Sequence, residues 1–152
     1  MFTAQIKNIK YMQFNFSTST KIRVRYGETD QMGYCYYGNY AQYFEVGRVE
    51  ALREVGLSYK EMEQKGIMLP VSEYNVKYLY PAFYDDELNI TTKIEKLKGC
   101  RLLFQYEIFN LDNKKIATAS TTLVFVSKST MKPISPPEDF ITLMHKYEVR
   151  KH

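Results

Sequence analysis

The feature that most constrains the fold is one long amphipathic segment followed by a series of alternating segments. Residues 38–55 carry a predicted buried stripe of apolar or small side chains at three- and four-residue spacing, and Gly56 follows as a helix stop. The stripe consists of Tyr40, Phe44, Gly47, Ala51, Leu52 and Val55. Patterns of period two then predict strands over residues 68–80, 87–98, 101–110 and 115–126. Because only short breaks separate these strands, they favour an antiparallel sheet; a parallel sheet would need a crossover between each pair. The sequence therefore predicts an α+β fold in which one antiparallel sheet packs on a long helix.

The N-terminal part of the chain has a weaker pattern. Basic and apolar residues alternate over 21–26, which predicts a strand with one buried face. The Ser-Thr-Ser-Thr sequence at 17–20 predicts a turn. Residues 1–19 are then expected to form a loose arm or a short strand.

Two shorter helices are predicted on either side of the strand series. Residues 58–65 begin with Ser58 and carry Glu61 three positions later, a helix-capping pattern, and Gly66 ends the segment. Residues 136–147 start with Pro-Pro-Glu-Asp and predict a C-terminal helix. The chain has neither an internal repeat nor a linker that would divide it, so its 152 residues predict a single domain.

Composition excludes several classes of function. The formal net charge of +4 is too small to predict a nucleic-acid surface, although it mildly favours anionic ligands. Cys35 and Cys100 stand alone, which predicts free thiols and no metal site. Since the chain has neither a leader-like start nor 18 consecutive apolar residues, we expect a cytoplasmic protein without a membrane span.

Asp30 is the leading candidate for a catalytic residue. It lies in a glycine-containing turn between the strand predicted at 21–26 and the long helix. The free backbone amides at the start of that helix follow seven to ten residues later, and such amides polarise a carbonyl oxygen. An acid beside amide donors suits attack on a carbonyl, whereas an isolated aspartate before a glycine turn is more often a turn or capping residue.

The segment from Arg25 to Arg53 resembles the acyl-CoA thioesterases of the 4-hydroxybenzoyl-CoA thioesterase group. These are hotdog-fold proteins, in which an antiparallel sheet wraps a long central helix. The similarity extends over about residues 20–140, with further matches at 81–88 and 131–133. The matching residues in the first segment are Glu28, Thr29, Asp30, Gly33, Gly38, Asn39, Tyr40, Phe44, Glu45 and Arg48.

This resemblance implies a chemical role for several of these positions. Asp30 is the expected nucleophile or general base, and the backbone amides of Tyr37, Gly38 and Asn39 are the expected donors to the carbonyl oxygen. Tyr37 stands where a histidine is frequent in the family, which argues against a histidine-assisted mechanism. The expected substrate-binding residues are Gly33, Tyr40 and Glu45, and Glu45 would either orient water or Asp30 or form an ion pair with Arg48.

The resemblance also implies a substrate and an assembly. The expected substrate is an acyl-CoA or an acyl carrier protein thioester, and the expected assembly is a homodimer or homotetramer without a cofactor. A basic cluster at Lys93, Lys96, Lys98 and Arg101 is either a site for the CoA phosphates or a solvated hairpin. Residues expected to set the depth of an acyl tunnel are Tyr40, Phe44, Met62, Leu69 and Tyr74.

Two alternative functions differ in their requirements. A hotdog dehydratase would need a histidine near the helix, but the only histidines are His145 and His152 in the C-terminal segment. A non-catalytic protein that binds acyl-CoA or an acyl carrier is the stronger alternative. Ligand binding alone has no use for an acid beside the thioester, so Asp30 favours the enzyme.

Overall fold

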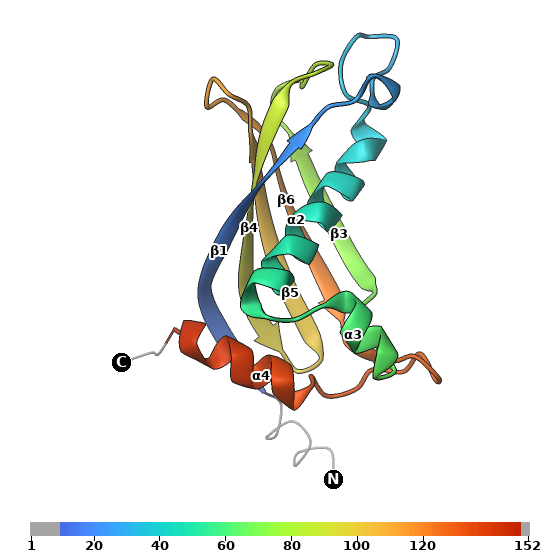
Figure 1. Ribbon diagram of the computed structural model, residues 1–152, viewed down its shortest axis with the longest axis vertical. Helices are drawn as coiled ribbons and strands as arrows, with labels where there is room; N and C mark the ends of the chain where they lie inside the picture. The colour runs from blue at the N-terminus through green and yellow to red at the C-terminus, as the bar shows by residue number, and fades with distance from the viewer. Residues whose placement is uncertain (1–9, 150–152) are drawn as a thin grey trace.

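A five-stranded antiparallel sheet wraps around one long helix in this protein, as the sequence predicted. The structure is a computed structural model that describes residues 10–149. Figure 1 shows the curved sheet with helix α2 (Tyr40–Val55) lying along its concave side. The strands, in spatial order, are β1 (Tyr11–Arg23), β4 (Glu87–Lys98), β5 (Arg101–Phe109), β6 (Lys115–Val124) and β3 (Val71–Tyr78).

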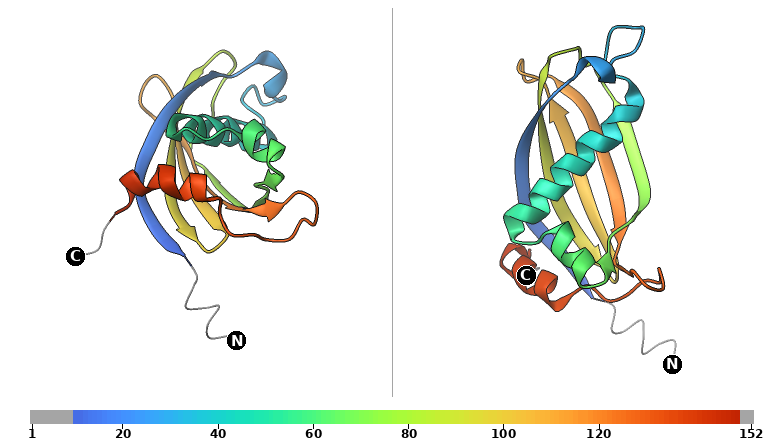
Figure 2. Two further views of the ribbon diagram at one scale, coloured as in Figure 1. Left: turned by 60° about the horizontal axis from the view of Figure 1, so that its bottom comes forward. Right: turned by 45° about the vertical axis from the view of Figure 1, so that its right-hand side comes forward.

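Short elements lie at the two ends of this helix–sheet unit. Two 3₁₀ turns, η1 (Tyr26–Glu28) and η2 (Tyr37–Asn39), precede α2, and the loop between them is at the end of the molecule where α2 begins (Figure 1). The elements near the other end of α2 are α3 (Tyr59–Gln64), the paired strands β2 (Ile67–Met68) and β7 (Val126–Ser127), α4 (Glu138–Met144) and η3 (His145–Tyr147) (Figure 2).

The N-terminal strand is longer than the sequence predicted. β1 pairs with β4 from Tyr11 to Arg23, so the expectations of a loose arm over 11–19 and of a turn at 17–20 are wrong. The strand also ends at Arg23, not at residue 26. The even-numbered residues face the core, with Met12, Phe14 and Phe16 buried, while the serines and threonines continue the same alternation. Residues 1–9 lie outside the described residues.

Two predicted strands and the C-terminal helix are interrupted. The predicted strand 68–80 divides into β2 and β3 around Leu69–Pro70, because a proline lacks the amide that a ladder needs. The predicted strand 115–126 ends at Val124, and β7 turns away to pair with β2. The helix predicted over 136–147 is α4 followed by the 3₁₀ turn η3.

The predicted short helix and its cap are present. α3 begins after Ser58, whose hydroxyl accepts a hydrogen bond from the Glu61 amide at 3.4 Å. Both cysteines are free thiols, as predicted. None of the helices within residues 10–149 combines the length and the apolar character needed to cross a bilayer.

Helix α2 packs closely on the sheet through its glycine. Its buried side is formed by Tyr40, Tyr43, Phe44, Gly47, Ala51, Leu52 and Val55, and only Tyr43 was absent from the predicted stripe. Gly47 lies against Thr92 and Ile90 of β4, and a β-carbon built on Gly47 would lie 3.1 Å from Ile90 Cγ2 and still closer to Thr92 Oγ1. The helix therefore needs a residue without a side chain at this contact.

Candidate active site

Asp30 lies in a tight turn that fixes its carboxylate. The Asp30 amide donates to the Tyr34 carbonyl at 3.0 Å, and the Gly33 amide donates to the Asp30 carbonyl at 3.0 Å. Asp30 Oδ1 accepts the Met32 amide at 2.9 Å, which is the geometry of an aspartate-headed turn. Gly33 has φ 85°, a left-handed conformation that favours glycine. Asp30 Oδ2 makes no hydrogen bond with any residue in the range 10–149.

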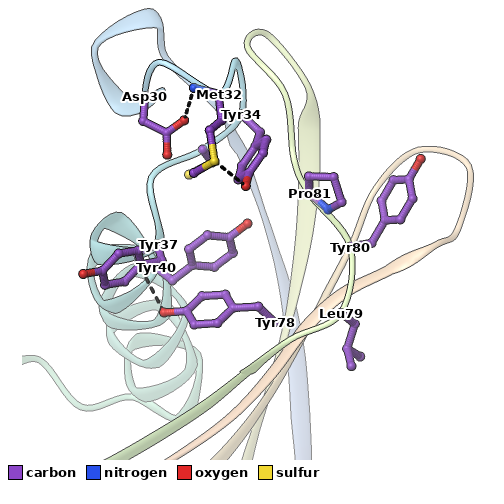
Figure 3. Close-up of a pocket in the computed structure, with 10 residues that line it drawn as sticks. Asp30, Met32, Tyr34, Tyr37, Tyr40, Tyr78, Leu79, Tyr80 and Pro81 are labelled. Carbon is purple, nitrogen blue, oxygen red and sulfur yellow. Dashed lines mark hydrogen bonds between the residues drawn. The ribbon is translucent and has the colours of Figure 1, made fainter.

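The Asp30 turn forms one wall of a pocket of about 400 Å³. Figure 3 shows side chains from the loop, from α2 and from the end of β3 around this space. Tyrosines dominate the lining, which consists of Asp30, Met32, Tyr34, Cys35, Tyr37, Tyr40, Tyr78, Leu79, Tyr80 and Pro81. The pocket therefore has largely aromatic walls with one carboxylate among them.

The structure brings only some of the predicted site residues to this pocket. Asp30, Tyr37 and Tyr40 line it, whereas Gly33, Gly38 and Asn39 are not among the lining residues and Gly33 contributes to the turn. Glu45 is exposed on α2 and is not among the lining residues. It also forms no ion pair with Arg48 in the described part of the chain, so that alternative is wrong. Arg48 instead lies beside the hydroxyl groups of Tyr59 and Tyr106.

The three predicted amide donors differ in availability. The Asn39 amide donates to the Tyr36 carbonyl at 3.0 Å inside the 3₁₀ turn, so it is already bonded. The amides of Tyr37 and Gly38 have no acceptor among residues 10–149. The Tyr78 hydroxyl donates to the Tyr37 carbonyl at 3.0 Å and holds this peptide against β3. Two free amides thus remain at the helix start for a negatively charged oxygen.

A buried carboxylate that the sequence analysis left without a role lies behind the turn. Glu28 is 8 % exposed, and its Oε1 accepts the Arg25 amide and the Tyr43 hydroxyl, both at 2.9 Å. The Tyr43 hydroxyl also lies 3.4 Å from Cys35 Sγ. The sequence does show an acid, Glu28, two residues before Asp30 and a tyrosine, Tyr43, on the helix. It does not show that the two side chains meet, because only folding brings them together.

Burial determines the protonation of the groups around the pocket. Burial is the largest influence on Cys35 and raises its pKa, so the group is a thiol at neutral pH and a poor nucleophile. Burial also raises the pKa of Tyr40 and of Tyr43, which keeps both hydroxyls protonated and able to donate hydrogen bonds. No group of three or more His, Cys, Asp and Glu side chains in residues 10–149 is arranged to hold a metal ion.

The predicted basic cluster lies far from Asp30 within one chain. Arg23 pairs with Glu87 and Tyr11 pairs with Lys98, so the Asp30 loop follows the Glu87 end of β4 and Lys98 marks the other end. Among the predicted tunnel residues, Tyr40 lines the pocket and Phe44 packs behind it, with its ring 6.1 Å from that of Tyr74. Met62 instead borders a separate cavity between α3 and α4, and Leu69 is buried outside the pocket lining.

Comparison with known proteins identifies the family. The profile of the thioesterase-like superfamily matches residues 24–143. The chain is 35% identical to YneP of Bacillus subtilis over 131 residues, which cover 86% of this chain and 95% of that protein. It is 32% identical over 120 residues to the acyl-CoA thioester hydrolase YbgC of Escherichia coli, covering 79% of this chain and 90% of YbgC.

The solved structure of a DHNA-CoA thioesterase from Staphylococcus aureus superimposes with a TM-score of 0.83 at 38% identity, covering 86% of this chain and 89% of that one. The chain therefore belongs to the thioesterase-like superfamily and has its hotdog fold.

Proposed function

We propose that this protein hydrolyses acyl-CoA thioesters to a free acid and CoA. The observation that carries the proposal is that Asp30 and Tyr37, whose amide has no acceptor among residues 10–149, line the same pocket. Support comes from the family match and from YbgC, whose name describes it as an acyl-CoA thioester hydrolase. The pocket also has room for an acyl group beside the carboxylate, since its volume is about 400 Å³.

In the proposed reaction the thioester carbonyl oxygen lies against the amides of Tyr37 and Gly38. These amides stabilise the negative charge that develops on this oxygen, and one well-placed donor contributes about 2.7–4 kcal/mol. Asp30 either attacks the carbonyl carbon or removes a proton from an attacking water. In the first route Asp30 forms a mixed anhydride as the C–S bond breaks and CoA thiolate leaves, and water then cleaves the anhydride. In the second, water adds to the carbonyl carbon as Asp30 takes its proton, the C–S bond breaks, and the leaving CoA sulfur receives that proton.

Thiol release from a panel of acyl-CoAs tests this function against the non-catalytic alternative. The panel should contain short, medium and long straight-chain thioesters and aromatic ones, with a CoA thioether as a substrate that cannot be hydrolysed. We expect turnover of at least one thioester and only binding of the thioether in calorimetry. Binding of thioesters without thiol release would instead favour an acyl-CoA or acyl carrier binding protein.

The proposed unit is a homodimer, or a homotetramer of such dimers. Strand β3 is at the edge of the sheet, and it leaves large apolar side chains exposed from Val71 to Tyr80. An exposed edge strand with such side chains favours covering by a second chain. Sedimentation velocity should therefore give a mass of at least twice 18.0 kDa, and a monomer at micromolar concentration would contradict this assembly.

A further inference from the structure

We propose that Glu28 and Tyr43 are positioning residues that hold the Asp30 turn and the free helix amides at a fixed separation. This inference rests on the proposed function of the same pocket. Glu28 is two residues before Asp30, while Tyr43 is one turn into α2 from the amides of Tyr37 and Gly38. Their side chains meet directly, because the Tyr43 hydroxyl donates to Glu28 Oε1 at 2.9 Å. We call this contact the Glu28–Tyr43 clamp.

The carboxylate of Glu28 is held by more than one donor. Besides the Tyr43 hydroxyl, Oε1 accepts the Arg25 amide at 2.9 Å, and Oε2 lies 3.4 Å from Arg25 Nη2. The Arg25 side chain is 78% exposed, so its guanidinium contributes little to the attraction. The buried contacts, which involve the Arg25 amide and the Tyr43 hydroxyl, therefore join the end of β1 to the buried side of α2.

The main chain of Glu28 makes a second pair of links. Its carbonyl accepts the Tyr36 amide and the Asn39 side-chain amide, both at 2.8 Å. Tyr36 directly precedes Tyr37, and Asn39 belongs to the same 3₁₀ turn, η2. Glu28 thus lies in the segment that carries Asp30 and is hydrogen-bonded to the segment that carries Tyr37.

Glu28 holds these segments from behind the pocket. It is not a lining residue of the Asp30 pocket, and it borders a different hollow with Arg25, Gly27, Asn39 and Gln42. Its Oε1 accepts the Arg25 amide and the Tyr43 hydroxyl, and its Oε2 lies 3.4 Å from Arg25 Nη2, so both oxygens already have contacts within the chain. Glu28 therefore positions the site and takes no part in a step of the reaction.

The test compares Glu28→Met, which keeps the length of the side chain but removes both acceptor oxygens, and Tyr43→Phe with a matched control, Tyr106→Phe. Tyr106 is also a buried tyrosine whose hydroxyl is hydrogen-bonded, here 2.6 Å from Thr121 Oγ1, but it does not line the pocket. All three substitutions keep the approximate size of the side chain. We expect similar small losses in melting temperature for Tyr43→Phe and the control, because each removes one buried hydrogen bond.

The kinetic result should separate the clamp from the control. Misplacement of reacting groups by about 1 Å lowers the rate by about 100-fold, so kcat should fall by about 10- to 100-fold in both clamp variants. KM should change little, since neither residue touches the pocket. The control should keep wild-type kcat. Because both residues act through one contact, kcat of the double variant should be no lower than that of the less active single variant.

Hydrogen exchange provides a second measurement that does not depend on turnover. The amides of Asp30, Cys35 and Tyr36 are hydrogen-bonded in the structure, and they should exchange faster in the clamp variants but not in the control. Clamp variants that match the control in both kcat and exchange overturn the proposal, and so does a fall in kcat without faster exchange. A wild-type protein with no thioesterase activity would refute the proposed function, and exchange alone would then decide whether the clamp holds the loop.

Discussion

Replacement of Asp30 by asparagine should lower kcat by about 10²- to 10⁴-fold, the usual contribution of a positioned acid or base. The physical reason is that an amide neither attacks a thioester nor accepts a proton from water at neutral pH. An asparagine can still accept the Met32 amide through its Oδ1, as Asp30 does at 2.9 Å, so the turn should remain. The loss then reports chemistry and not local unfolding, and thiol release under saturating acyl-CoA measures it.

Two further variants complete this experiment. Asp112→Asn makes the same change in the exposed β5–β6 turn and should keep wild-type turnover and KM. Asp30→Ala also removes the acceptor for the Met32 amide, so it should lower both kcat and the melting temperature. If the wild type is active and Asp30→Asn has the same activity, the Asp30 carboxylate has no role in the mechanism.

Replacement of Gly47 by valine should lower the free energy of unfolding by about 3 kcal/mol, the upper end of the usual cost of overpacking a core. A β-carbon at this position meets Thr92 Oγ1 and lies 3.1 Å from Ile90 Cγ2. Both contacts come from short, branched side chains on a central part of the sheet, which cannot move aside easily. The helix must therefore shift away from β4, and urea unfolding measures the cost.

The chain offers a control and a partial rescue for this substitution. Ala41→Val adds a branched side chain on the same helix at an exposed position, so it should cost only a few tenths of a kcal/mol. Thr92→Ala removes the obstructing hydroxyl, which has no hydrogen-bond partner among residues 10–149, and should restore part of the stability of Gly47→Val. Equal losses in the free energy of unfolding for Ala41→Val and Gly47→Val would show that close packing at Gly47 is unimportant.

The main elements of the fold were predictable because their patterns are local. The stripe of α2 and the alternation in β4, β5 and β6 repeat with the period of the element they form. The ends of the elements were less predictable. Ser17–Thr20 looked like a turn because its residues are polar, yet they pair with β4 in an edge strand. Ser17 and Ser19 face the solvent there, while Thr18 and Thr20 are half-buried on the other face.

The candidate site was predictable only in part. Asp30, Tyr37 and Tyr40 belong to one motif in the sequence, and the structure places all three on the same pocket. Tyr78, at the end of β3, and Pro81, just after it, complete that pocket from about 40 residues later in the chain. The sequence placed them in a predicted strand and in a matching segment, but no local pattern shows that they join Asp30. Glu45 was expected to bind substrate because the resembling family carries an acid there; in the structure it lies on the exposed side of α2, outside the pocket lining.

The sequence alone determined the family, the order of the main elements and the acid that is the candidate for chemistry. These depend on periodicity and on a compact motif, which a single chain displays without folding. Only the tertiary structure decided which amides remain free, which side chains enclose the pocket and how Glu28 meets Tyr43. Hydrogen bonds and burial between distant segments depend on how the sheet curves around α2, and the Asp30 loop meets Ala82 and Phe83, just beyond β3, through Cys35 and Tyr34.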